Sequence, residues 1–353
     1  MPAIRIRGTK RFLWSLAVTV VSFLLPTEGC GPQTASPFRR ESTAMDTFVS
    51  VTIFERDIGE QNASGAAEAV FREIERVEAA ATNYNDSSEI GRINLHSGVD
   101  SVRVSDEIAG LIRESIRYSA ESDGAFDITV GPLVRLWNFL ADKPLVPSDV
   151  ELRNLLHLVD RRLVSTNGNM IYLKKKGMSL DLGAIAKGYA VDRAIALLRQ
   201  SGMKQVIVDL GGNLGVYWEG TWMLDSTRAT IYIRHPRRDG EMFGHFDVGT
   251  SGVSTSGDYQ RYFIQEGKRY HHILDPHTGY PVREVVSVTV IAANAMEADA
   301  LSTTAFVLGL EKGMDLIETL PDVEGLMVYE EGDTLAYMVS SGLRGKFFVG
   351  DGE

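Results

Sequence analysis

The sequence predicts an α+β fold with mixed, largely antiparallel sheets, packed helices and one domain of two lobes. Two kinds of periodicity carry this prediction. Apolar residues recur at helical spacing from Asn62 to Ala81 and again after Ser105, whereas they alternate with polar residues from Thr47 to Phe54 and around Ile231. A strand-like run meets Asp-Leu-Gly twice, at 181 and 209, which points to two related lobes.

Length and charge restrict the class of protein. A chain of 353 residues with 44% hydrophobic residues can bury a large core, so it is globular. The net charge is -11, and the Lys and Arg residues are scattered without long clusters. We therefore expect no nucleic-acid partner. An anionic ligand would need a bound metal ion or local hydrogen-bond donors.

Residues 1–30 are predicted to be a lipoprotein-type signal peptide. Basic residues precede an apolar run from Phe12 to Leu25, which suits a secretory signal better than a membrane span. The only cysteine, Cys30, has no second cysteine for a disulfide, so we expect it to carry a lipid. An ordinary signal peptide with an unmodified cysteine is the alternative. These features predict an exported, extracytoplasmic protein on the periplasmic side, anchored to the membrane.

Residues 31–44, rich in Ser, Thr and Pro, are predicted to be a flexible tether, and residues 45–353 the folded domain. In the first half of the domain we expect a strand over 47–54, helices over 62–81 and from Ser105, and a short helix after a capping box at Ser148–Glu151. Two glycines and a proline predict a strand between tight turns within 123–132. Further strands are expected at 170–173, 178–182 and 205–210.

Strands are expected to dominate residues 222–283, and two helical stretches follow at 294–309 and 310–320. Three short strands then complete the domain, at 326–329, 336–339 and 346–349. The predicted chain therefore ends as a strand-rich half with a helical pair inside it.

The segment from Asp181 to Asp192 joins a predicted strand end to a helix start. A helix N-terminus presents unpaired N–H groups and positive dipole, so a phosphate could bind there, with Lys187 in the first turns. Neither a Walker loop nor a Gly-x-Gly-x-x-Gly motif is present. The alternative is that Gly183 only makes a tight turn.

The predicted helix over 294–309 carries the candidate metal ligands. At helical spacing Asp299 and Thr303 lie one turn apart on one face, with Ser302 beside them. Hard oxygen ligands on a rigid element suit Mg²⁺. The alternative is a buried helix whose small polar side chains bond to their own backbone.

Adjacent histidines precede Ile273-Leu-Asp-Pro, which places a candidate acid/base imidazole, His272, at a strand end. Structural histidines are the alternative. Ser254, His272 and Asp275 also supply the residue types of a serine hydrolase. No Gly-x-Ser-x-Gly motif is present, and Asp275 follows His272 too closely to orient its ring, so we give that function little weight.

Together these segments resemble the ApbE-type FAD:protein FMN transferases from about Met45 to the end of the chain. Asp46 is a departure, because the family prefers Met-Gly-Thr at this point. The similarity is carried by short motifs in a specific order: Met45-Asp-Thr47, Tyr84-Asn85 with Ser88-Glu-Ile90, Ala125-Phe-Asp127 with Gly131-Pro132, Asp181 to Gly188 with Asp192, Gly211-Gly-Asn213, Ser254 to Gly257, His272 to Pro276 with Thr278-Gly279, and Ala298 to Thr303.

The resemblance implies roles for individual residues. Tyr84 matches the aromatic residue that stacks on the flavin ring, and His272 matches the histidine implicated in transfer. Magnesium would be held by the Ala184 carbonyl with Asp299, Thr303 and Ser302. Positions that contact FAD are matched by Met45, Ala125, Phe126, Asp127, Asp181, Lys187 and Ile273.

The implied activity is Mg²⁺-dependent transfer of FMN from FAD onto a threonine of acceptor proteins such as membrane redox subunits, with release of AMP. FAD would bind in a cleft between the two lobes. With water in place of the acceptor, the same site would be an FAD pyrophosphatase that gives FMN and AMP. A third alternative is a lipoprotein that only binds flavin.

Overall fold

The computed structural model describes residues 36–55, 58–220 and 228–350. Its centre is an eight-stranded sheet in the order β1-β2-β6-β7-β10-β13-β14-β15, and each neighbouring pair is antiparallel. The strands of this sheet are β1 (Phe38–Ala44), β2 (Thr47–Ile53), β6 (Gln205–Leu210), β7 (Asn213–Trp218), β10 (Ser251–Gly257), β13 (Ser287–Ala292), β14 (Glu324–Glu331) and β15 (Thr334–Val339). The α+β fold class with largely antiparallel sheets is thus confirmed.

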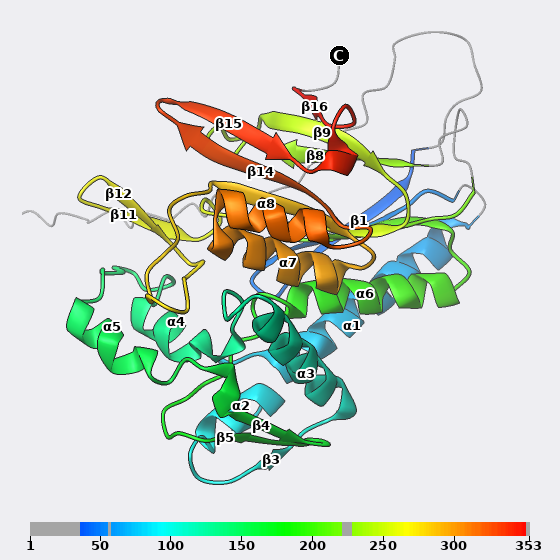
Figure 1. The fold of residues 1–353 in the computed structure, drawn as a ribbon. Coiled ribbons are helices and arrows are strands. Elements are labelled where there is room, and N and C mark those ends of the chain that lie inside the picture. The colour runs from blue at the N-terminus through cyan, green and yellow to red at the C-terminus, as the bar shows by residue number, and fades with distance from the viewer. Residues whose placement is uncertain (1–35, 56–57, 221–227, 351–353) are drawn as a thin grey trace, which may run out of the picture.

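A layer of helices covers one face of this sheet (Figure 1). Apolar residues at helical spacing drive the packing: in the first of these helices Ala63, Ala67, Val70, Ile74 and Val77 are buried against β2 and β6. The layer consists of α1 (Glu60–Ala81), α6 (Ala186–Gln200), α7 (Ala295–Leu308) and α8 (Leu310–Thr319). The opposite face of the sheet packs on a small sheet of β16 (Phe348–Val349), β9 (Met242–Val248) and β8 (Ala229–Arg234).

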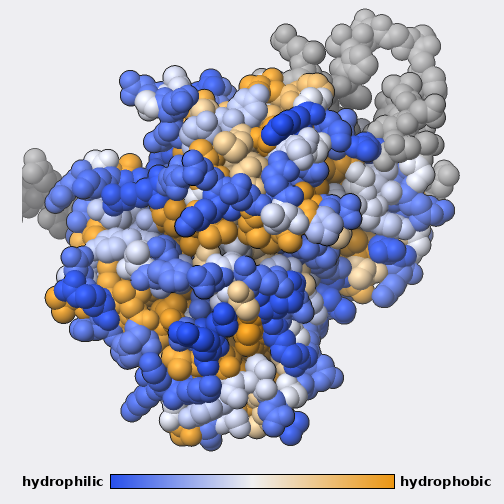
Figure 2. Space-filling model, in the orientation of Figure 1, coloured by the Kyte–Doolittle hydropathy of each residue, from blue (hydrophilic) through white to orange (hydrophobic). Residues whose placement is uncertain are grey.

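Beyond the helical layer lies a smaller region, drawn at the bottom of Figure 1. It contains α2 (Glu89–Leu95), α3 (Asp106–Glu121), α4 (Gly131–Trp137) and α5 (Asp149–Leu156), with a sheet of β3 (Val102–Arg103), β5 (Met170–Leu173) and β4 (Val164–Asn167). A separate hairpin of β11 (Tyr262–Gln265) and β12 (Lys268–His271) packs near α4 through aromatic side chains. Figure 2 shows apolar side chains at the surface over α4 and α5, where Leu145 and Val150 are exposed.

Three sequence predictions are wrong in detail. Residues Phe38–Ala44 form β1 rather than the end of a tether, because a hairpin pairs them with β2. The segment 123–132 contains no strand: Ile128–Val130 is a 3-10 helix capped by the Asp127 side chain, and α4 follows with Pro132 in its first turn. Residues 178–182 are not a strand either, since Asn94 and Ile128 supply the backbone bonds of Leu180 and Asp181.

The other predicted elements agree with the structure within a few residues, and α7 and α8 are separated by Gly309 at φ +82°. Helix α2 was not predicted, since its polar residues were interpreted as part of a loop. The signal peptide and Cys30 lie outside the described residues, as do 221–227 of the predicted strand-rich region. Within the described ranges, no helix is long and apolar enough to cross a membrane. A ligand cleft between two lobes stays a prediction.

Candidate active site

Helix α7 brings its carboxylate to the start of α6. Asn294 caps α7 by accepting a hydrogen bond from the Glu297 N–H, and Asp299 follows one turn later with only 3% of its surface exposed. Its Oδ2 accepts a hydrogen bond from the Gly188 N–H at 3.0 Å, and its Oδ1 lies 4.0 Å from Lys187 Nζ. Two segments 111 residues apart in the sequence thus meet at one carboxylate.

The close approach of α6 and α7 depends on a glycine and a second carboxylate. A Cβ on Gly188 would lie 2.2 Å from the Ala295 carbonyl oxygen, so only glycine lets the helices pack at this distance. Asp192 on α6 accepts hydrogen bonds from the Ala295 and Met296 N–H groups at 2.8 and 2.9 Å. Asp192 therefore caps α7 from another helix and fixes where Asp299 lies.

The Ala184 carbonyl lies in the turn that precedes α6, whose N-cap is Ile185. In a helix extended by one residue, the Gly188 N–H would bond to the Ala184 carbonyl. That N–H instead donates to Asp299. Gly188 therefore links the start of α6 to Asp299, and the pairing of the Ala184 carbonyl with Asp299 stays a prediction.

A cluster of hydroxyl groups adjoins Asp299 between α7 and β10. Ser302, fully buried, has its Oγ 2.9 Å from Ser256 Oγ and 3.2 Å from Ser254 Oγ, and donates to the Asp299 backbone carbonyl at 3.0 Å. Thr303 Oγ1 lies 3.2 Å from Ser256 Oγ. The backbone-bonding alternative therefore holds for Ser302 in part, whereas Thr303 and Asp299 bond to other elements.

These residues fit a hard divalent cation. Burial raises the pKa of Asp299, and the Lys187 charge and the Gly188 N–H oppose that rise. A buried carboxylate whose cationic neighbour lies 4.0 Å away is a costly group that a metal ion would compensate. The described residues hold no cluster of three or more His, Cys, Asp or Glu. One carboxylate with neutral oxygens suits Mg²⁺, which keeps several waters.

His272 directly follows β12 and is held by its backbone, since its N–H donates to the Arg261 carbonyl at 3.0 Å. Its Nδ1 is buried and has no hydrogen-bond partner among the described residues. Burial, followed by the positive charges of Arg261, His271 and Lys187, lowers the pKa of His272 to about 3. The imidazole is therefore neutral near pH 7 and can accept a proton.

The neighbouring residues of this segment have structural roles. His271 is buried, bonds through Nε2 to the Val282 carbonyl and packs edge-on against Phe306. Asp275 accepts hydrogen bonds from the His277 N–H and the Thr278 hydroxyl within its own turn. Asp275 therefore does not orient the His272 ring, which removes the arrangement that a serine hydrolase requires.

Tyr84 lies between α1 and α2 with 67% of its surface exposed, so its ring is accessible to a ligand. Partial burial of its hydroxyl and the charge of Asp181 raise the pKa of Tyr84, whereas the Arg261 charge lowers it. Asp181 accepts hydrogen bonds from Asn83 Nδ2 at 2.9 Å and from the Gly183 N–H at 2.8 Å. Asp181 thus ties the Tyr84 loop to the turn before α6.

The remaining predicted FAD contacts are mostly buried. Asp127 uses both carboxylate oxygens within the fold, on Thr129 and on the Arg161 N–H. Ala125, Phe126 and Ile273 are buried apolar residues. Sequence reasoning assigned no role to Asn83, Asp192 or Arg261. The position of Asp192 next to the Asp181 to Gly188 motif could have indicated a role for it. The contacts of Asn83 and Arg261 become evident only in the three-dimensional structure.

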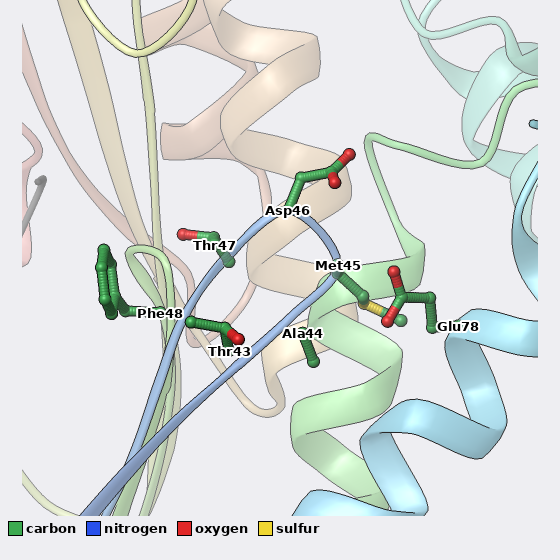
Figure 3. Close-up of a pocket in the computed structure, with 7 residues that line it drawn as sticks. All are labelled: Thr43, Ala44, Met45, Asp46, Thr47, Phe48 and Glu78. Atoms are coloured by element: carbon green, nitrogen blue, oxygen red, sulfur yellow. The ribbon is translucent and has the colours of Figure 1, made fainter. Parts of the chain in front are cut away.

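Met45 lines a shallow hollow of about 360 Å³ at the tip of the β1–β2 hairpin, shown in Figure 3. The Met45 side chain lies beside Glu78 of α1, while the Asp46 carboxylate points away from it. The other lining residues are Thr43, Ala44, Thr47 and Phe48. None of the other predicted site residues lines this hollow, so it adjoins the candidate site rather than containing it.

Comparison with known proteins identifies the family of this chain. The family model described as the ApbE family matches residues 45–327. A Klebsiella pneumoniae protein named FAD:protein FMN transferase is 37% identical over 273 residues, which cover 76% of this chain and 84% of the relative. A Treponema pallidum protein of the same name is 32% identical over 334 residues, covering 90% of this chain and 91% of the relative.

Solved structures give the same result. The ApbE protein of Thermotoga maritima superposes with a TM-score of 0.79 at 32% identity, covering 88% of this chain and 99% of that one. A variant of the flavin transferase ApbE from Vibrio cholerae has a TM-score of 0.78 at 30% identity, covering 88% of this chain and 100% of that one. The chain is therefore an enzyme of the ApbE family.

Proposed function

We propose that this protein transfers the FMN part of FAD onto a threonine hydroxyl of an acceptor protein, with Mg²⁺ bound, and releases AMP. The names of its relatives support the transferase activity. The observation that carries the proposal is the meeting of Asp299 with the first turn of α6, next to Lys187. Such a helix start offers N–H groups and positive charge to a pyrophosphate, and Asp299 offers a ligand to its metal ion.

Each residue has a physical task in this proposal. Asp299, Thr303 and the Ala184 carbonyl would hold the ion, and the Ser256 hydroxyl orients Thr303. A bound Mg²⁺ supplies Lewis-acid neutralisation of the charge on the pyrophosphate oxygens. The exposed ring of Tyr84 would stack on the isoalloxazine.

His272 is suited to be the proton acceptor of the transfer. Its ring is neutral near pH 7 and so has a nitrogen that can accept a proton, and the negative charge of a bound pyrophosphate would raise its lowered pKa towards the range in which a base takes the proton of the acceptor threonine hydroxyl. A bond then forms from the threonine Oγ to the FMN phosphorus, while the phosphorus–oxygen bond to AMP breaks. Threonine is a weak nucleophile at this pH, so this proton transfer is worth about 10²- to 10⁴-fold in rate.

We also propose that the enzyme acts outside the cytoplasm, on the periplasmic side, where a lipid on Cys30 would hold it at the membrane near acceptors such as membrane redox subunits. The basic and apolar pattern before Cys30 supports this location. Mass spectrometry of protein extracted from membranes would detect the lipid. An unmodified Cys30 in the membrane fraction would contradict the anchor.

The central experiment incubates the protein with FAD, Mg²⁺ and an acceptor domain that carries a candidate threonine. The expected result is a fluorescent acceptor band in a denaturing gel and an equal amount of AMP by chromatography. The matched control replaces the acceptor threonine by alanine and removes the band. AMP and free FMN without a band would show FAD hydrolysis instead, and neither product would leave flavin binding alone.

A further inference from the structure

The β1–β2 hairpin carries an acidic residue at its tip. Ala44 pairs with Thr47, and the two residues between them, Met45 and Asp46, have φ of +49° and +57°. Two positive φ values define a tight type I′ turn, which favours Asn, Gly or Asp. The backbone therefore tolerates Asp at the second position of the turn. The turn itself does not need the charge of the carboxylate.

The position of this tip is fixed by the central sheet. The Gly211 N–H, in the turn between β6 and β7, donates to the Phe48 carbonyl at 3.1 Å. A Cβ on Gly211 would lie 2.4 Å from Thr47 Oγ1, so the hairpin packs directly on that turn. The backbone at Asp46 is consequently held in place.

Asp46 faces a cation that belongs to the candidate site. Its Oδ2 lies 3.7 Å from Arg261 Nη2, and the Arg261 carbonyl accepts the N–H of His272. The Arg261 charge also acts on the rings of His272 and Tyr84. The guanidinium therefore lies beside the hairpin tip, and its charge reaches the residues assigned to proton transfer and flavin stacking.

The ion pair is weak in this arrangement. A separation of 3.7 Å exceeds hydrogen-bond length, and the side chains of Arg261 and Asp46 are 35% and 60% exposed. An exposed ion pair of this kind favours the paired over the unpaired state by at most about fivefold. A pyrophosphate presents several charged oxygens to the planar fork of arginine, which makes it the stronger partner.

We propose that the Arg261 side chain leaves Asp46 and binds the pyrophosphate of a flavin dinucleotide instead. Asp46 thereby lowers the affinity of the free enzyme for that ligand. The inference rests on the proposed function for the identity of the ligand. It assigns Arg261 as a ligand-binding residue and Asp46 as the residue that competes for it.

The test measures FAD binding to the full chain by quenching of flavin fluorescence, without Mg²⁺, so that turnover plays no part. Asp46→Asn keeps a residue suited to the turn and removes only the charge, and it should tighten FAD binding about two- to fivefold. Arg261→Ala should weaken it by about tenfold or more. At about 1 M salt, where the Debye length is about 3 Å, both differences should shrink.

Controls separate this exchange from general charge effects. Glu78→Gln removes a charge from the other side of the hollow and should leave FAD affinity unchanged. Riboflavin, which lacks phosphates, should bind wild type and all variants alike. In the Arg261→Ala background, Asp46→Asn should give a smaller gain, because no guanidinium remains to be released.

Three results would overturn the proposal. An unchanged FAD affinity in Arg261→Ala, with unchanged thermal melting, would remove Arg261 from the site while the proposed transferase function stands. An equal gain from Asp46→Asn with and without Arg261 would mean that Asp46 acts by repulsion alone. If wild type bound neither FAD nor riboflavin, the proposed function would fail as well.

Discussion

Replacing Asp299 by asparagine should distinguish the effect of its buried charge on the stability of the fold from its effect on the proposed binding of Mg²⁺. The carboxylate is 3% exposed, and burial raises its pKa, which means that the ionised form at pH 7 destabilises the metal-free fold. Asparagine keeps an oxygen that can accept the Gly188 N–H but carries no charge. Without Mg²⁺, Asp299→Asn should therefore melt at a higher temperature than wild type.

Addition of Mg²⁺ should reverse that order. An ion at about 100 times its dissociation constant stabilises the form that binds it by about 2.7 kcal/mol. Wild type should gain this amount, seen as a rise of several degrees in thermal melting, while Asp299→Asn gains nothing. Loss of several kcal/mol of charge neutralisation also predicts a fall in FAD turnover of about 10³-fold or more.

Thermal melting with and without Mg²⁺, followed by AMP release assays on the same samples, measures both effects. Asp315→Asn, the same chemical change at an exposed position of α8, should respond to Mg²⁺ as wild type does. The metal assignment is refuted if Asp299→Asn keeps the Mg²⁺-dependent rise in melting temperature or full turnover.

Three further changes test other parts of the site. His272→Gln should leave FAD affinity intact and slow transfer by about 10²-fold or more. The pKa of His272 in the folded protein is lowered to about 3, so this group reduces the stability of wild type as the pH falls below about 6.5. Near pH 4 the variant should therefore melt at a higher temperature than wild type. Tyr84→Ala should weaken FAD binding about three- to tenfold without altering melting, since the ring is exposed. Gly188→Ala should lower the melting temperature and the Mg²⁺ response together, because its Cβ would meet the Ala295 carbonyl.

Each of these expectations can fail separately. Equal losses of FAD affinity and rate in His272→Gln would indicate a binding role for the imidazole. Unchanged flavin affinity in Tyr84→Ala would place the isoalloxazine elsewhere. A stable Gly188→Ala with a normal Mg²⁺ response would show that α6 and α7 can separate without loss of the site.

The sequence predicted those elements whose start and spacing depend only on residues close together in the chain. The helix that begins at Asn294 and the one-turn spacing of Asp299 and Thr303 are local signals within α7, so both were predicted from the sequence. The capping box at Ser148–Glu151 is equally local. What failed depended on distant partners or on a misread start signal. Pro132 in the first turn of α4 was taken for a strand boundary, although proline is common at helix starts.

β1 shows why a polar segment can still form a strand. Its residues lack a clear apolar alternation, and the Met45-Asp46 turn differs from the Asn-Gly signal of a type I′ hairpin. Pairing with β2 supplies its backbone bonds, and as an edge strand it needs no second neighbour. The sequence therefore placed the start of the domain at 45, seven residues after the start of β1 at Phe38.

The contact between Gly188 and Asp299 links the stability of the fold to its chemistry. The Gly188 N–H is one of the donors that a helix start leaves without a helical partner, and it bonds to one oxygen of a buried carboxylate. The Ser254 hydroxyl and the Lys187 ammonium, whose Nζ lies 4.0 Å from Oδ1, also favour the charged carboxylate, but the effect of burial is larger and the pKa of Asp299 stays raised. A carboxylate held in this way is fixed in place without an ion, and binding of the Mg²⁺ that we propose would offset the cost of its burial.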